Sequence, residues 1–204
     1  MKAVELFNNW VDLNKDQGME INHTPSVEYM LSMIPSKKIS NGFSFLDIGC
    51  GNGWVVRKMS KYKTCHKSVG IDGAEKMIEK AKLNDPNSTY YHLDLNSFNN
   101  FNDKFDVILS MEVIYYLNDP EALVSHVFDN LLKPEGVFLL GLDHYVENPL
   151  SLSWPCDLDV KMCTYTMSQW QSILKKKGFF NVELFQYGQN DDWKGTLVLV
   201  CTKQ

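Results

Sequence analysis

The chain has 204 residues, a formal net charge of −5 and an apolar fraction of 44%, which suits one globular domain with its own core. No apolar run is long enough for a membrane span and the first residues are too polar for a secretory signal, so we expect a cytoplasmic protein with no membrane partner. The negative charge argues against a nucleic-acid partner, which needs clustered Lys and Arg.

Cysteine and histidine follow no recognisable ligand pattern. The five cysteines are scattered, without a C-x-x-C pair, which indicates free thiols in a reducing compartment. The five histidines form no H-x-x-x-H cluster. The sequence therefore predicts no dedicated metal site.

Residues 1–40 are predicted to form a helical cap, with Thr24 as N-cap and Pro25 as the first residue of its second helix. From residue 43 onward, short apolar runs alternate with helical patterns. The predicted strands are 43–48, 68–72, 89–93, 105–110 and 136–142, and the predicted helices are 54–61, 74–83 and a segment ending near residue 132. Strands separated by helices imply right-handed crossovers and a parallel, doubly wound sheet.

The end of the chain breaks this alternation. Residues 144–166 carry two prolines and no clean period, so they form either a functional lid or a mobile loop. Ser168 and Gln171 are predicted to form a capping box that opens a helix ending at Gly178. Residues 179–187 and 193–202 then suggest an antiparallel hairpin.

We therefore predict an α/β, Rossmann-like doubly wound sheet of seven strands, five parallel plus a C-terminal antiparallel pair, with helices on both faces. A single domain is expected over residues 1–204. Its parts are a helical cap (1–40), a ligand-binding core (43–142), an insertion or lid (144–166), and a C-terminal helix with a β-hairpin (167–204).

Three glycines, Gly49, Gly51 and Gly53, follow the first predicted strand in the stretch FLDIGCGNGW. Their turn joins a strand to a helix at the carboxyl end of the sheet, where open α/β folds bind ligands. Asp72 ends the next predicted strand, where a carboxylate can accept hydrogen bonds from both hydroxyls of a ribose. Asp72 could also act as the N-cap of the following helix. Together these features indicate an adenosine-containing cofactor.

Two such cofactors compete, and Asp47 and Trp54 separate them. A dinucleotide fingerprint needs glycine where this sequence has Trp54. Its loop also holds a pyrophosphate, which the nearby Asp47 would repel. S-adenosylmethionine carries a sulfonium and an ammonium instead, and Asp47 attracts both charges. The methyl donor is therefore favoured over a nicotinamide dinucleotide and its oxidoreductase chemistry.

Over residues 43–142 the sequence resembles class I S-adenosylmethionine-dependent methyltransferases. The acidic residue and G-x-G-x-G motif, the ribose acid, FDVILSMEVIYYLNDP at the fourth strand and LKPEGVFLL before the fifth carry the resemblance. It implies S-adenosyl-L-methionine as cofactor, held by Asp47, Gly49, Cys50, Gly51, Gly53, Asp72, Gly73, Met77, Asp94, Leu95, Ser110 and Met111. Asp94 could instead cap a local turn, and Met77 and Met111 could be core residues.

Methyl transfer by in-line displacement requires an aligned acceptor and the exclusion of water, with a base only where the acceptor loses a proton. The polar groups expected near the methyl group are His23, Glu112, Tyr115, Tyr116, Asp143 and His144. Tyr116 stands where the family often has histidine, and a tyrosine with an ordinary pKa of about 10 is a poor base. His144 is the favoured base, although an exposed loop histidine explains it equally well.

The acceptor is less clearly indicated. Residues 110–113 read SMEV and lack the Asn/Asp-Pro-Pro-Tyr loop of enzymes that methylate exocyclic amines. The aromatic residues Trp10, Tyr145, Trp154 and Tyr165 either cover the strand ends or pack the ends of the domain. Two covering segments suit a small-molecule acceptor. Methylation of a protein or RNA partner, or a non-catalytic S-adenosylmethionine-binding domain, is the alternative.

Overall fold

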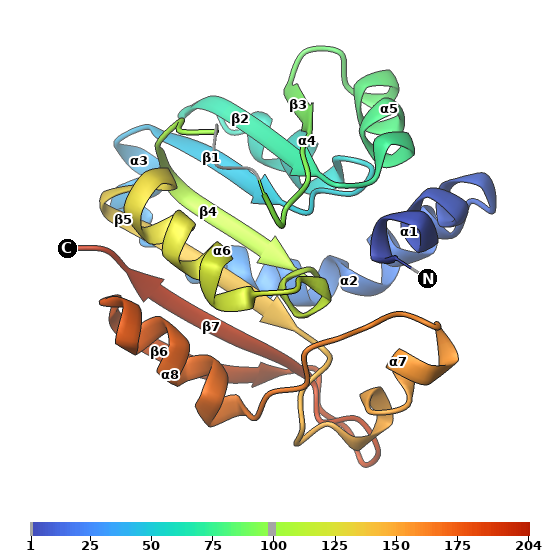
Figure 1. The fold of residues 1–204 in the computed structure, drawn as a ribbon. Helices are drawn as coiled ribbons and strands as arrows, with labels where there is room; N and C mark the ends of the chain where they lie inside the picture. The colour runs from blue at the N-terminus through green and yellow to red at the C-terminus, as the bar shows by residue number, and fades with distance from the viewer. Residues whose placement is uncertain (1, 98–100) are drawn as a thin grey trace.

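The computed structural model describes residues 2–97 and 101–204 and contains one seven-stranded sheet in the order β3-β2-β1-β4-β5-β7-β6 (Figure 1). The strands are β1 (Phe43–Ile48), β2 (Cys65–Asp72), β3 (Thr89–His92), β4 (Phe105–Met111), β5 (Leu132–Leu142), β6 (Phe180–Tyr187) and β7 (Thr196–Thr202). Strands β1 to β5 pair in parallel, and β7 runs antiparallel to both β5 and β6. The predicted fold class is confirmed.

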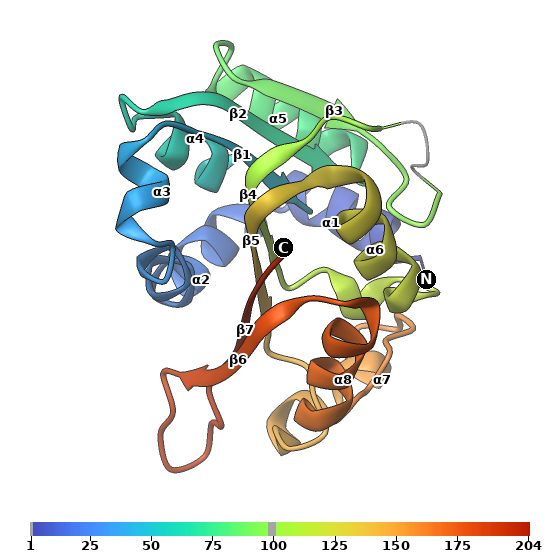
Figure 2. The ribbon, with the colours of Figure 1, turned by 90° about the vertical axis from the view of Figure 1, so that its left-hand side faces the viewer.

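Helices cover both faces of this sheet, as Figure 2 shows with α2, α3 and α4 on one side and α6 and α8 on the other. The helices are α1 (Ala3–Asp12), α2 (Lys15–Ser32), α3 (Ser36–Ser40), α4 (Trp54–Ser60), α5 (Glu75–Asn84), α6 (Pro120–His126), α7 (Trp154–Asp157) and α8 (Met167–Lys177). All six residues of β1 are buried, because a central parallel strand packs against helices on both faces.

Two apolar layers hold the helices to the sheet. On one face, Val27 and Met30 of α2 pack against the same cluster as Val107 of β4. On the other face, Leu123 of α6 and Trp170 of α8 belong to the larger cluster. Since burial of a large apolar side chain contributes about 2 to 3 kcal/mol, these contacts outweigh weak local preferences. Among the described helices, none combines the length and apolar composition needed to cross a membrane.

The N-terminal cap differs from the prediction at Thr24 and Pro25. Helix α2 runs without a break from Lys15 to Ser32 and contains Pro25, so the predicted helix start at Thr24 is wrong. The Thr24 hydroxyl donates a hydrogen bond to the Glu20 carbonyl within the helix. Packing of the following turns on the sheet sustains the helix through a residue that usually interrupts one.

The C-terminal half differs in its boundaries. The capping box of α8 lies two residues earlier than predicted, with Thr166 as N-cap and Gln169 as its partner in place of Ser168 and Gln171. Gly178 ends this helix in the left-handed region, as expected. Strand β5 begins at 132 rather than 136 and β7 at 196 rather than 193. The segment before β5 consists of a 3-10 turn (Ile114–Tyr116), α6 and a π-helical turn (Val127–Leu131).

Candidate active site

The glycine turn after β1 brings the backbone against a neighbouring loop. Gly49 has φ of +78°, and a Cβ placed on it would lie 2.0 Å from a methyl group of Val113. Its N–H donates to the Ile71 carbonyl of the neighbouring strand β2 at 2.8 Å. No other residue fits this position, because the turn needs both a positive φ and the absence of a side chain.

A cavity of about 680 Å³ opens beside this turn, at the carboxyl ends of the parallel strands. This volume suits a drug-sized cofactor with a small second ligand. The structure brings together most of the predicted cofactor residues in its lining. These are Asp47, Gly49, Cys50, Gly51, Asp72, Gly73, Met77, Asp94, Leu95 and Met111.

Two predicted cofactor residues, Gly53 and Ser110, do not line the cavity. A Cβ on Gly53 would lie 2.6 Å from the ring of Tyr90, so this glycine is required for packing of the turn against the core. Ser110 is fully buried, and its hydroxyl donates a hydrogen bond to the Ile48 carbonyl at 3.0 Å. Both residues have a packing role in the structure, and their contact with the cofactor stays a prediction.

The two acids at the ends of β1 and β2 lie in a strongly desolvated environment. Burial raises the pKa of Asp47 to about 8, and the negative charge of Asp72 adds to the shift. Burial also raises the pKa of Asp72, against the effect of its hydrogen bonds from Ala74 and Gly51. A cationic ligand would stabilise the charged form of such carboxylates, and a pyrophosphate would not. These residues therefore fit the sulfonium and ammonium of S-adenosylmethionine.

Asp72 and Asp94 also make local hydrogen bonds, as expected for a helix N-cap at Asp72 and a turn cap at Asp94. Asp72 accepts from the Ala74 N–H at 2.7 Å at the start of α5. Asp94 accepts from the Asn96 N–H at 3.0 Å and from the Ser97 hydroxyl at 3.0 Å. A carboxylate has about four acceptor sites, so these bonds leave capacity for ribose or adenine. Both carboxylates line the cavity.

The N-terminal helices contribute lining residues that the sequence did not single out. Phe7 of α1 lies on the cavity beside Trp10, and their rings meet edge to face at 5.4 Å. Asp16 of α2 is 1% exposed and accepts a hydrogen bond from Asn52 of the glycine turn at 3.1 Å, which ties α2 to the turn. The spacing of Val4, Phe7 and Trp10 along α1 is the only sequence signal that could have indicated this face.

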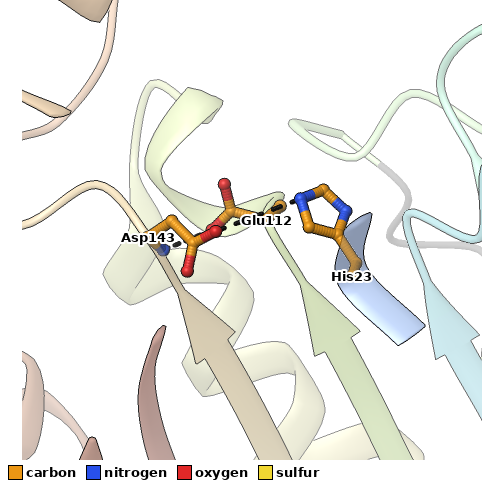
Figure 3. A group of neighbouring side chains, drawn as sticks. All are labelled: His23, Glu112 and Asp143. Atoms are coloured by element: carbon orange, nitrogen blue, oxygen red, sulfur yellow. Dashed lines mark hydrogen bonds and ion pairs between the residues drawn. The ribbon is translucent and has the colours of Figure 1, made fainter. Parts of the chain in front are cut away.

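The far end of the cavity contains Glu112 and His23, with Asp143 beside them (Figure 3). Glu112 follows β4 with φ of +60°, and its carboxylate accepts hydrogen bonds from the Tyr115 hydroxyl at 2.6 Å and from the Asp143 N–H. Burial raises the pKa of Glu112 well above its ordinary value, and the charge of Asp143 adds to the shift. Burial raises the pKa of Asp143 to about 6 and lowers that of His23.

Of the three predicted catalytic residues, Tyr115 and Tyr116 line the cavity and His144 does not. His144 is fully buried, and its ring nitrogens interact with the Ser151 carbonyl at 2.9 Å and the Thr164 hydroxyl at 2.8 Å. A base needs a free nitrogen within reach of the acceptor. The predicted role of His144 as base is therefore withdrawn, since this residue anchors the segment that follows β5.

The four aromatic residues divide between the two alternatives, covering the strand ends and packing the ends of the domain. Trp10 and Trp154 line the cavity. Tyr145 is fully buried and donates to the Gly195 carbonyl at 2.9 Å, while Tyr165 packs edge to face on Trp170. The segment 144–166 thus contributes one aromatic wall through α7 and packs its remaining aromatic side chains into the domain.

A mixed sheet in the order 3-2-1-4-5-7-6, with five parallel strands and an antiparallel pair, is typical of the class I S-adenosylmethionine-dependent methyltransferases, as are a glycine turn after the first strand and buried acids after the first two strands. Residues 24–184 match the sequence model of a family described as methyltransferase domain. The chain belongs to this family, and S-adenosylmethionine is its cofactor.

Solved methyltransferase structures share the fold. A complex between the Haloferax volcanii Trm112 methyltransferase activator and a methyltransferase matches with a TM-score of 0.81 and 23% identity, covering 96% of each chain. The N-methyltransferase NodS from Bradyrhizobium japonicum, solved with S-adenosyl-L-homocysteine, matches with a TM-score of 0.65 and 22% identity, covering 90% of this chain and 86% of NodS.

Curated relatives include ubiquinone biosynthesis O-methyltransferases. The protein from Dinoroseobacter shibae is 29% identical over 142 residues, which cover 64% of this chain and 56% of the relative. The protein from Ruegeria pomeroyi is 33% identical over 100 residues, which cover 47% of this chain and 39% of the relative. The matched part of the chain thus spans about half the length of these relatives or less.

Proposed function

We propose that this chain transfers a methyl group from S-adenosylmethionine to a small-molecule acceptor bound beside Glu112 and Tyr116. The observation that carries the proposal is the continuity of the cavity. It extends from the acids after β1 and β2 to Glu112 after β4, under α1, α2 and α7. A covered cavity of this kind aligns a small acceptor and keeps water away from it.

S-adenosylmethionine, when bound, supplies a methyl group already activated by a positive sulfur, so the task of the protein is binding and alignment. In this proposal Asp72 holds the ribose hydroxyls, Asp47 lies near the cationic end, and Asp94 with Leu95 contacts the adenine. Gly51 and Gly73 allow the ligand close to the backbone. These assignments follow the family motifs that the sequence matches, and each of these residues lines the cavity.

Tyr115 and Tyr116 are proposed to orient the acceptor rather than to take its proton. Burial raises the pKa of both hydroxyls above the ordinary value, and the charge of Glu112 adds to each shift. A hydroxyl with a raised pKa stays protonated. The Tyr115 hydroxyl already donates its proton to Glu112, so Tyr116 is the proposed hydrogen-bond donor to the acceptor and Tyr115 acts by holding Glu112. Phe7 contacts the ring of Tyr116 edge to face at 5.2 Å, so α1 positions this side chain.

The test is incubation of the protein with isotopically labelled methyl donor and a fractionated metabolite extract, followed by mass spectrometry of labelled products. Wild-type protein should label a discrete small molecule. Asp72→Asn should not label it at the same donor concentration, and Glu135→Gln, at an exposed position near the start of β5, is the matched control. Absence of any labelled metabolite with wild-type protein that binds S-adenosylhomocysteine would contradict a small-molecule acceptor.

The O-methyltransferase names of the curated relatives support a hydroxyl group as acceptor.

A second candidate is methylation of a protein or RNA with a bound activator subunit. It is supported by the Haloferax volcanii relative, which was solved with the Trm112 activator. Purification of a tagged chain from its native cells distinguishes the two. A stoichiometric partner that is needed for activity on macromolecules, together with no activity on metabolites, would favour this candidate.

A further inference from the structure

One imidazole and two carboxylates meet at the acceptor end of the cavity, although they come from three separate elements. His23 belongs to α2, Glu112 follows β4 and Asp143 follows β5 (Figure 3). One donor atom from each side chain lies within 4.8 Å of the other two. The parallel pairing of β4 with β5 brings the two carboxylates together, and α2 lies across the same strand ends.

We propose that His23, Glu112 and Asp143 bind one divalent cation of the Mn²⁺ class, with its remaining coordination positions facing the cavity. Mn²⁺, Fe²⁺ and Zn²⁺ all bind imidazole nitrogen with carboxylate oxygen, and two carboxylates to one imidazole favour the harder Mn²⁺. Ca²⁺ takes oxygen donors only, and soft ions take thiolates, which this cluster lacks. Three protein donors leave positions of an octahedron open for water or for an oxygen of the acceptor.

The separations in the cluster fit a shared ion better than direct hydrogen bonding between His23 and Asp143. The Nε2 atom of His23 lies 4.0 Å from Oδ2 of Asp143, which is too long for a hydrogen bond. Two donors bound to one ion at about 2.1 Å each lie roughly 3.0 Å apart when adjacent and about 4.2 Å apart when opposite. The three donors lie within 4.8 Å of one another, so their closure around one ion requires the side chains to move inward.

The negative charge of the two carboxylates also favours a bound cation. Among the described residues, neither Glu112 nor Asp143 forms an ion pair with a lysine or arginine. Asp143 is 8% exposed, and its buried Oδ1 accepts no hydrogen bond from the described part of the chain. A buried carboxylate oxygen without a partner is costly, and coordination of a cation removes that cost.

Glu112 is oriented as metal ligands usually are. Its Oε2 accepts from the Tyr115 hydroxyl and its Oε1 from the Asp143 N–H. Each carboxylate oxygen has two acceptor sites, so both keep one for an ion. Hydrogen bonds of this kind hold a ligand in the right direction. Because His23 and Glu112 line the cavity, an ion can reach them from it.

Titration calorimetry of tag-free protein with MnCl₂, in the absence of any methyl donor, tests the site. Wild-type protein should bind one Mn²⁺ per chain, and Asp143→Asn should weaken binding at least tenfold. Asp94→Asn removes a carboxylate from the opposite end of the same cavity and should bind Mn²⁺ like wild type. Mn²⁺ is the chosen probe because the free cysteines prefer softer ions.

His23→Gln provides a second variant, because His23 is partly exposed on a helix and its replacement leaves the buried carboxylates in place. It too should weaken Mn²⁺ binding at least tenfold. Circular dichroism before each titration shows whether a variant is folded. If Asp143→Asn does not fold, the affinity of His23→Gln for Mn²⁺ decides whether the site exists. No saturable binding to wild-type protein, or equal affinity of wild type and His23→Gln, would overturn the site. Since no donor is present, failure here is separate from failure of the proposed methyl transfer.

Discussion

The carboxylate of Asp72 accepts a hydrogen bond from the backbone N–H of Gly51 at 2.9 Å, across 21 residues of sequence. Its other oxygen accepts from the Ala74 N–H at 2.7 Å. The end of β2 is thus joined both to the glycine turn after β1 and to the start of α5. One side chain shapes the turn and also faces the cavity, so its two roles have to be separated by experiment.

Replacing Asp72 tests that separation. Asp72→Ala leaves two N–H groups without their acceptor and should lower the free energy of unfolding by about 1 to 3 kcal/mol. It should also weaken binding of S-adenosylhomocysteine at least tenfold, as titration calorimetry can measure. Asp72→Asn keeps one oxygen for the backbone and should recover much of the stability without the affinity. An unchanged affinity in both variants would contradict the ribose role.

Gly49→Ala should destabilise the protein far more than the same replacement at another glycine with a similar φ. The new Cβ would lie 2.0 Å from Val113, whereas Gly188, with φ of +76°, has open space around it. Gly188→Ala should cost about 1 to 2 kcal/mol of stability from backbone strain alone. Gly49→Ala should add about 1 to 3 kcal/mol of overpacking and abolish cofactor binding. Urea unfolding of the two variants measures the difference, and equal losses would show that the close approach is unimportant.

Cofactor affinity should rise with pH through the ionisation of Asp47. Burial, with the charge of Asp72, raises its pKa to about 8, so at pH 7 the free protein holds this carboxyl mostly protonated. A cationic ligand favours the ionised form, and the affinity should increase about fivefold to tenfold between pH 7 and pH 8.5.

Calorimetry of S-adenosylmethionine binding at several pH values, in the absence of an acceptor, measures this slope. In buffers of different ionisation enthalpy, binding to wild type at pH 7 should release a proton. Asp47→Asn should bind more weakly and lose both the slope and the proton release. A slope that persists in this variant would assign the effect to another group.

Asp106 and Lys133 should contribute stability that depends on pH. Burial of Asp106 acts to raise its pKa, but hydrogen bonds from Lys133 and Ser44 outweigh it and lower the pKa to about 2. A carboxyl with a lowered pKa in the folded state stabilises the protein above the unfolded pKa of about 3.9, and this is lost as pH falls towards 2.

Asp106→Asn should therefore lower the free energy of unfolding by about 1 to 2 kcal/mol at pH 7, a figure reduced for the partial exposure of Lys133. The gap between wild type and variant should narrow below pH 4. Urea unfolding at pH 7 and at pH 3 measures it. A gap that stays constant over this range would show that ionisation of Asp106 is not involved.

The succession of strands and helices along the chain and the glycine turn could be predicted because both depend on local patterns. Continuous apolar runs such as Phe43–Ile48 mark strands that are covered on both faces, and the intervening helical patterns imply parallel pairing. Boundaries were predicted less well. Pro25 lies inside α2 and the α8 cap lies at Thr166, since packing of a whole helix on the sheet overrides the preference of one residue.

The sequence by itself determined the fold class, the methyl-donor cofactor and most of the predicted residues that line the cavity, because strand ends and their acids recur at set spacings along the chain. Only the tertiary structure decided which polar groups meet at the end of the cavity near Glu112. It buried His144 and placed His23 of the N-terminal helix beside Glu112 and Asp143. Contacts between residues so far apart depend on how the helices pack over the strand ends, and no local spacing records that packing.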